Sequence, residues 1–144
     1  MASISSFFRI VLAIVLTVPC TALAFCTGAR RPTLEQEVSE AEVVVVANVI
    51  RETILTEDPS DPIGVTATEY RIKVSNFLRG IAQRELTVRS ENTSSRFPLS
   101  LGVSYLLILN RDVNGALFVD NCGNSGTLSE RKAEQKTLET MQRK

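Results

Sequence analysis

The chain has 144 residues, 16 basic and 16 acidic side chains, and a mean hydropathy of +0.08. A balanced charge excludes a global field that gathers nucleic acid or anionic lipid. The absence of histidine excludes Ser-His-Asp and Cys-His catalysis and histidine metal ligands. We therefore expect a binding protein rather than an enzyme, with no catalytic residue, metal or cofactor.

Residues 1–24 are typical of a secretory signal peptide. Arg9 precedes an uncharged apolar run, and Ala22 and Ala24 supply the small residues that signal peptidase prefers. The run is about half the ~20 residues that span a bilayer, and an uncleaved anchor is the alternative. Cleavage after Ala24 predicts a secreted or periplasmic protein that begins at Phe25.

Removal of this segment leaves 120 residues with a net charge of −1, which suit one domain over 25–128 and a polar helical tail over 129–144. The cysteines that remain, Cys26 and Cys122, are expected to pair in an oxidising compartment. Such a bridge would contribute about 4–5 kcal/mol in the entropic account. Lipidation is disfavoured, because proline precedes Cys20 and phenylalanine precedes Cys26.

In chain order, the first predicted element is a helix over 33–41, which a capping box from Thr33 to Gln36 opens. Residues 43–54 are β-branched and nearly continuously apolar, which favours a central strand buried on both faces at its start. Turn-forming residues from Thr56 predict a surface loop.

Two further strands follow this loop. The stretch from Val65 to Gly80 alternates, with Tyr70, Ile72 and Val74 on the inner face. The segment RELTVRS repeats the pattern and predicts a third strand, and the polar residues ENTSSRFPLS predict a loop after it.

The remaining segment predicts a hairpin and a helix. VSYLLILN is a strongly apolar strand, and GALFVDNC is its expected antiparallel partner through Asn114-Gly115. A second capping box, from Thr127 to Glu130, predicts a helix that continues to Lys144 and packs lightly or frays. Together the elements predict a mainly β domain: a five-stranded antiparallel OB-type barrel with a short N-terminal helix and a C-terminal helix. A small sandwich is the alternative.

Three sets of polar residues are candidate sites. Glu57, Asp58 and Asp61 are oxygen ligands for a hard cation, but their spacing matches no calcium loop and favours a solvated loop. Asn92 begins an N-glycosylation acceptor pattern, meaningful in a eukaryotic secretory pathway. The loop serines have no histidine to activate them, so a structural role is expected for Ser94, Ser95 and Ser100.

A series of basic residues follows the second and third predicted strands. OB barrels bind nucleic acid on such faces, but interspersed glutamates and few aromatic residues favour a solvated outer face and no nucleic acid. The series comprises Arg71, Lys73, Arg79, Arg84, Arg89 and Arg96.

Several segments in order resemble one known family. They are Cys26, the passage SEAEVVVVANV, the strand YRIKVSNFLRG, the strand LTVRS, the strand GVSYLLIL and NCG near the end. Over roughly residues 26–130 the chain resembles the netrin-like OB domains and the tissue inhibitors of metalloproteinases within them. The resemblance implies a secreted, monomeric inhibitor whose partner is a zinc metalloprotease.

In that family the α-amine and carbonyl of an N-terminal cysteine chelate the catalytic zinc, and the next side chain enters the substrate pocket. Cys26 and Thr27 match this opening. Chelation requires that Phe25 be removed, since an amide nitrogen is a poor zinc ligand. Gly28 stands where the family's vertebrate inhibitors have another cysteine, and this chain has one possible bridge where they have several. The alternative is a non-inhibitory netrin-like module that binds another extracellular protein.

Overall fold

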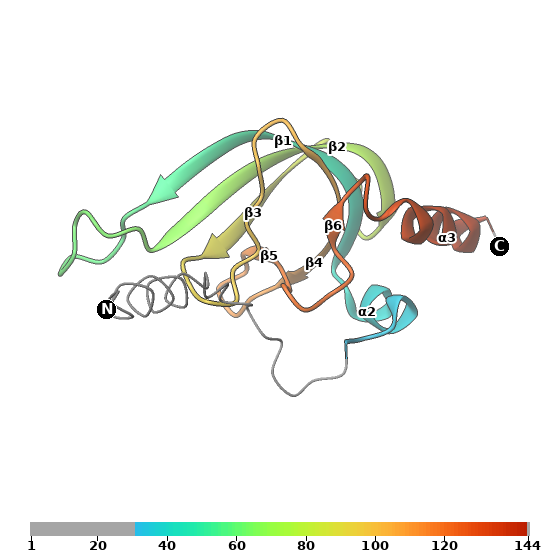
Figure 1. Cartoon of the computed structure of the whole chain (residues 1–144), viewed down its shortest axis with the longest axis horizontal. Helices are drawn as coiled ribbons and strands as arrows, with labels where there is room; N and C mark the ends of the chain where they lie inside the picture. The colour runs from blue at the N-terminus through green and yellow to red at the C-terminus, as the bar shows by residue number, and fades with distance from the viewer. Residues whose placement is uncertain (1–30, 144) are drawn as a thin grey trace, which may run out of the picture.

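The computed structural model describes residues 31–143. Figure 1 shows a curved sheet that closes on itself, with one helix beside the start of the first strand and another at the C-terminal end. The elements in order are α2 (Leu34–Glu40), β1 (Val43–Leu55), β2 (Ala67–Arg79), β3 (Glu85–Glu91), β4 (Ser104–Arg111), β5 (Leu117–Val119), β6 (Gly126–Thr127) and α3 (Lys132–Gln142).

The sheet is a closed barrel, because β1 pairs with both β2 and β4. The order β1-β2-β3-β5-β4 closes back onto β1, and β6 adds a short pairing to β4. The predicted five-stranded OB-type barrel with its two helices is therefore confirmed.

The expectation of an entirely antiparallel sheet is wrong at one place. Strands β3 and β5 pair in parallel, at Val88 and Leu117. The reason is topological: β4 pairs antiparallel with β1, and β5 returns antiparallel to β4, so β5 runs in the direction of β3. The barrel is a mixed one.

Strands β1 and β4 are buried on both faces, as their continuous apolar sequences predict. Val45 and Leu107 point into the barrel, whereas their neighbours Val44 and Ile108 point outward and are fully buried there too. The outward side chains form a second core with the helices, which includes Leu138 of α3 and, partly buried, Val38 of α2. Two apolar layers therefore meet at these strands.

The predicted first capping box is present. Gln36 N–H donates to Thr33 Oγ1, and Thr33 N–H donates to Gln36 Oε1, both at 3.2 Å. The second box forms only in part: Thr127 N–H and Thr127 Oγ1 both donate to Glu130 Oε2, at 3.3 and 2.7 Å, whereas Glu130 N–H donates to the Thr127 carbonyl. These bonds close a turn and do not open a helix. Helix α3 begins only at Lys132.

Helix α3 is attached more firmly than the sequence suggests. Its Leu138 is 3% exposed in the second core. The Asn76 side chain donates to Glu139 Oε1 at 3.1 Å, and the Gln142 side chain donates to the carbonyl of Leu78. A single buried apolar side chain matches the predicted light packing, and the two amide hydrogen bonds, which the sequence did not predict, attach the helix to β2.

Strand β5 is shorter than predicted. It ends at Val119, because the Asp120 side chain accepts a hydrogen bond from Cys122 N–H (2.9 Å) and its carbonyl accepts one from Gly123 N–H (3.1 Å). This turn, from Asp120 to Gly123, contains Cys122 and leads the chain away from the strand. The hairpin from β4 to β5 is otherwise as expected, with Gly115 at φ +85° in its turn.

The hairpin of β1 and β2 extends past the barrel (Figure 1). Residues 43–49 of β1 are mostly buried, whereas Ile50 through Ile54 are exposed. Register shifts along the pair mark irregularities that bend the two strands. At the tip, Ile54 is 61% and Ile63 is 90% exposed.

Candidate functional site

The residues predicted to contact a protease, Cys26 and Thr27, lie outside the described residues. So do Phe25 and the predicted signal peptide over 1–24. The bridge between Cys26 and Cys122 therefore stays a prediction. The structure does describe the surface from which the leading segment departs, beginning at Arg31.

The departure point is fixed to the turn that contains Cys122. The Arg31 guanidinium donates from Nη2 to the carbonyl of Gly123 at 2.8 Å. Next along the chain, the carbonyl of Pro32 accepts a hydrogen bond from Asn124 Nδ2 at 3.1 Å. Two consecutive residues before α2 are thus bound to two consecutive residues after Cys122. We call this the entry joint: Arg31, Pro32, Gly123 and Asn124.

Glu37 of α2 stabilises the entry joint through its carboxylate. Its side chain is buried, and its Oε2 accepts hydrogen bonds from Asn124 N–H (2.7 Å) and Asn124 Nδ2 (2.6 Å). Its Oε1 is buried with no hydrogen-bond partner among residues 31–143. Gly123 lies so close that a Cβ there would come within 2.0 Å of this oxygen. The joint therefore requires glycine at 123 and a carboxylate at 37.

A shallow groove of about 520 Å³ lies beside the entry joint. Phe97 and Tyr105 form one wall, with their rings edge to face at 6.4 Å between centroids. The Tyr105 hydroxyl accepts a hydrogen bond from Ser100 N–H at 3.0 Å, which fixes the preceding loop. Arg31, Arg131 and Glu130 also line the groove, so its rim carries charges of both signs with one basic group in excess.

The rim is partly neutralised by α3. Arg131 donates from Nη1 to Glu134 Oε1 at 3.0 Å. A hydrogen bond from its own backbone N–H lowers the pKa of Glu134, and the hydrogen bond from Arg131 lowers it further. Glu134 is thus a carboxylate that holds the Arg131 guanidinium in place.

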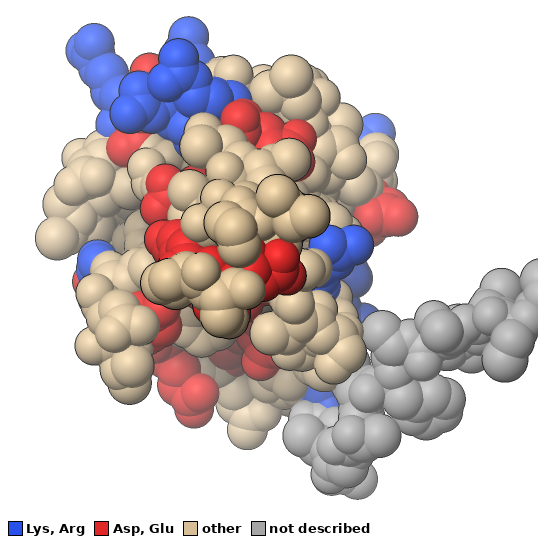
Figure 2. Space-filling view, turned by 90° about the vertical axis from the view of Figure 1, so that its left-hand side faces the viewer, with Lys and Arg blue, Asp and Glu red and all other residues tan. Residues whose placement is uncertain are grey.

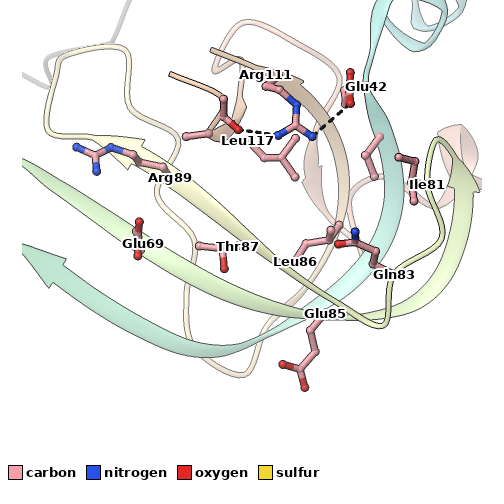
Figure 3. Close-up of a pocket in the computed structure, with 13 residues that line it drawn as sticks. Glu42, Glu69, Ile81, Gln83, Glu85, Leu86, Thr87, Arg89, Arg111 and Leu117 are labelled. Atoms are coloured by element: carbon pink, nitrogen blue, oxygen red, sulfur yellow. Dashed lines mark hydrogen bonds and ion pairs between the residues drawn. The ribbon is translucent and has the colours of Figure 1, made fainter. Parts of the chain in front are cut away.

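A second hollow, which the sequence did not indicate, opens in the wall of the barrel (Figure 3). We call it the β3 cleft. It measures about 450 Å³ and lies between the first half of β3 and the hairpin of β4 and β5. Val43, Leu86 and Leu117 are apolar side chains at the cleft, and Glu69, Glu85 and Arg111 are charged ones. It exists because β5 meets β3 at one residue pair only.

Ion pairs restrain the cationic groups at the β3 cleft. Arg111 donates to the carbonyl of Gly115 (2.6 Å) and pairs with Glu42 (3.2 Å), as the dashed lines in Figure 3 indicate. Arg89 pairs with Glu57 at 2.6 Å and with Glu91 at 2.5 Å. The hydrogen bonds to these carboxylates raise the pKa of Arg89, and the bond to Glu57 contributes most.

The acidic loop does not assemble a cation site. Glu57 binds Arg89, and Asp58 Oδ1 accepts hydrogen bonds from Ser60 N–H (2.8 Å) and Ser60 Oγ (2.6 Å). Within residues 31–143, no three acidic, cysteine or histidine side chains are grouped as metal ligands. Figure 2, which views the molecule from the side on which the hairpin projects, shows acidic side chains gathered centrally and basic ones towards the margins.

The predicted basic series is divided among separate partners. Arg71 lies 3.9 Å from Glu85, and Arg79 donates to the carbonyl of Ser39 at 2.8 Å. Arg96 donates to Asn92 Oδ1 at 3.2 Å. Together with the ion pairs of Arg89, these contacts place both signs of charge on the outer face.

The remaining polar candidates lie in the exposed loop after β3. Asn92 is exposed, and its Nδ2 donates to the carbonyl of Val65 at 2.9 Å, so the predicted glycosylation acceptor ties its loop to the end of the connection between β1 and β2. Ser95 shares a hydrogen bond with Thr93 at 3.2 Å. Ser94 and Ser100 are exposed as well.

No family model and no curated protein matches the chain. Among residues 31–143, no helix is both long enough and apolar enough to cross a membrane.

Proposed function

We propose that the protein is a secreted or periplasmic inhibitor of a zinc metalloprotease, similar to the tissue inhibitors of metalloproteinases, and that it acts as a monomer without catalytic activity. Cys26 and Thr27 are the contact residues. The observation that supports this proposal is the entry joint, in which Arg31 and Pro32 are bound to Gly123 and Asn124.

The entry joint limits where Cys26 can lie. Arg31 lies five positions after Cys26, and an extended chain advances at most about 3.3–3.6 Å per residue. Cys26 is therefore within about 18 Å of Arg31, which is itself bound beside Cys122. A bridge between the two cysteines would hold the leading segment in one conformation. Such preorganisation lowers the entropy cost of binding a partner.

The chemistry of chelation sets one further condition. A free α-amine at Cys26 is a zinc ligand, whereas the amide formed with Phe25 is not. The proposal therefore includes removal of Phe25 after signal cleavage. The intact mass of the exported protein tests this step directly, because the two termini differ by one phenylalanine.

The inhibition experiment uses two matched proteins, one that begins at Cys26 and one that begins at Phe25. Each is titrated against a panel of zinc endopeptidases. We expect the first to inhibit at least one protease and the second to be at least a hundredfold weaker. Equal inhibition by both would exclude chelation. Failure of both would favour the alternative, a netrin-like module that binds another extracellular protein without inhibiting it.

A further inference from the structure

The groove beside the entry joint lies where the described part of the chain begins. Arg31 and Gly123, which are joined by a hydrogen bond, both line it, and so does Cys122. The chain that precedes Arg31 must therefore continue from the edge of this groove. In the expected mature protein that stretch is residues 25–30.

The predicted bridge between Cys26 and Cys122 limits the position of Phe25. Chain length alone places Phe25 within about 22 Å of Arg31. The Cα atoms of bridged cysteines lie about 4.4–6.8 Å apart, and consecutive Cα atoms about 3.8 Å apart. With the bridge formed, the Cα of Phe25 lies within about 11 Å of the Cα of Cys122. Because Cys122 lines the groove, the Phe25 ring is then close enough to enter it.

The groove wall includes apolar surface that residues 31–143 do not cover. Phe97 is half-buried and Pro98 is exposed. Tyr105 contacts Phe97 edge to face, and its hydroxyl already accepts a hydrogen bond from Ser100 N–H. The wall therefore presents carbon atoms of Phe97 and Pro98. Such a surface favours an apolar or aromatic side chain.

One side chain of the leading segment fits this surface. Residues 25–30 read FCTGAR, so Phe25 is their only large apolar side chain. A phenylalanine ring gains free energy in proportion to the apolar area that it removes from water. Aromatic rings also favour edge-to-face contacts, such as the one already present between Phe97 and Tyr105. Sequence, chain length and groove composition thus favour the same occupant.

Charge does not decide the occupant. Arg31 and Arg131 line the groove, and so does Glu130. Arg131 is paired with Glu134 at 3.0 Å. The two basic groups are therefore matched by two acidic ones, and selection depends on apolar contact and on the length of the tether.

We propose that this groove holds the Phe25 side chain in the protein that still begins at Phe25, and that the contact slows removal of Phe25 by an aminopeptidase. Removal hydrolyses the bond between Phe25 and Cys26 with one water molecule, which yields free phenylalanine and the α-amine of Cys26. The peptidase captures the terminus only while the ring is outside the groove. This regulation rests on the proposed function, because it concerns the form that precedes the chelating one.

The ring contacts are measured directly by NMR in the protein that begins at Phe25. We expect nuclear Overhauser effects from the Phe25 ring to Phe97 and Pro98. The variant Phe25→Ala assigns the ring signals, because they disappear in its spectrum. Absence of these contacts in the unmodified protein, or contacts of Phe25 with other residues only, would overturn the proposal.

The rate at which an aminopeptidase removes Phe25 tests the consequence. Intact mass follows the loss of one phenylalanine, and a free peptide of residues 25–30, with its cysteine carbamidomethylated, gives the unprotected rate. We expect removal from the protein to be at least tenfold slower than from the peptide. Phe97→Ala should accelerate removal from the protein about tenfold, because it takes away the largest apolar contact.

The matched control is Phe118→Ala. Phe118 is also half-buried, but it lines a neighbouring hollow of about 310 Å³ and not the groove. This variant should change the removal rate by less than about twofold. Circular dichroism confirms that both variants remain folded, and the ring contacts in the unmodified protein depend on neither. No acceleration by Phe97→Ala, or equal acceleration by both variants, would contradict the proposed seat of Phe25.

Neither readout involves a zinc protease, so failure of this proposal is distinguishable from failure of the proposed function. A seated Phe25 in a protein whose trimmed form inhibits no protease would contradict the proposed function alone. An unseated ring in a protein whose trimmed form does inhibit would contradict the groove contact alone.

Discussion

Glu37 on α2 and Asn124 in the turn after β5 form the closest polar contact between the two ends of the domain. One carboxylate oxygen of Glu37 accepts hydrogen bonds from both the backbone and the side chain of Asn124, at 2.7 and 2.6 Å. The two residues are 87 positions apart in the sequence. A single buried side chain therefore joins the start of the domain to the loop of Cys122.

Replacement of this carboxylate should destabilise the whole domain. Glu37→Ala leaves the Asn124 donors without their acceptor, and we expect the free energy of unfolding to fall by about 2–3 kcal/mol. Urea denaturation measures it. The control Glu40→Ala, on the exposed side of the same helix, should change stability by less than about 0.5 kcal/mol. Equal effects of the two substitutions would contradict the assigned role.

Glycine at 123 is required by the same contact. In Gly123→Ala the new Cβ would lie 2.0 Å from Glu37 Oε1, so the carboxylate must leave Asn124. We expect a loss of about 1–3 kcal/mol. In the Glu37→Ala background most of this loss should disappear, because the obstructing oxygen is absent. A loss of the same size in both backgrounds would show that the glycine matters for another reason.

Arg89 should control the titration of Glu57. Hydrogen bonds from Arg89 lower the pKa of Glu57 from its ordinary value of 4.5. The stabilisation from this pair is therefore present above about pH 4.5 and is lost as the pH falls through the lowered pKa of the folded protein. In Arg89→Ala, carboxyl NMR should show the pKa of Glu57 returning toward 4.5. The pKa of Asp58, which Ser60 lowers by hydrogen bonding, is the internal control and should not move.

Ser125 should be needed as the hydrogen-bond acceptor for a buried backbone N–H of strand β4. Its buried Oγ accepts a hydrogen bond from Ile108 N–H at 2.9 Å. Ser125→Ala leaves that amide buried without an acceptor, and we expect a cost of about 1–3 kcal/mol in denaturant unfolding. Ser39→Ala, which removes an exposed hydroxyl, should cost less than about 0.5 kcal/mol. Similar losses would indicate that β4 does not depend on Ser125.

The predicted bridge between Cys26 and Cys122 has a direct chemical readout. Exported protein treated with iodoacetamide under denaturing conditions, without reductant, should keep an unchanged mass. After reduction it should gain two carbamidomethyl groups and lose about 4 kcal/mol of stability. Alkylation of both cysteines before reduction would show that the bridge does not form.

The sequence predicts the barrel well because its strands have local signatures. The buried strands β1 and β4 are continuous apolar runs, and β2 alternates with Ile72 inward and Arg71 outward. The parallel pairing of β3 with β5 has no such signature, since it follows from how the chain crosses the barrel. The predicted start of α3 at Thr127 is wrong because the hydrogen bonds between Thr127 and Glu130 close a turn, and the helix begins only at Lys132.

The candidate sites were harder to predict because they too depend on contacts between residues that are distant in the sequence. Glu37 reads as one of several glutamates on an exposed helix, and only the distant Asn124 explains its burial. The β3 cleft depends on where β5 begins, because β5 runs parallel to β3 and meets it first at Leu117. The turn from Asp112 to Gly115, which precedes β5, sets that starting point.

Strand β1 divides at Val49 into a half that belongs to the barrel and a half that is exposed, whereas its partner β2 keeps Ala67, Tyr70 and Ile72 buried. Opening of the outer half of β1, from Ile50 to Ile54, therefore removes little apolar burial from β1 itself. Amide protons of this outer half should exchange through small local fluctuations, while those of Val44–Val46 exchange only through global unfolding. A protease could therefore nick the tip near Ile63 and leave a folded, two-chain barrel behind.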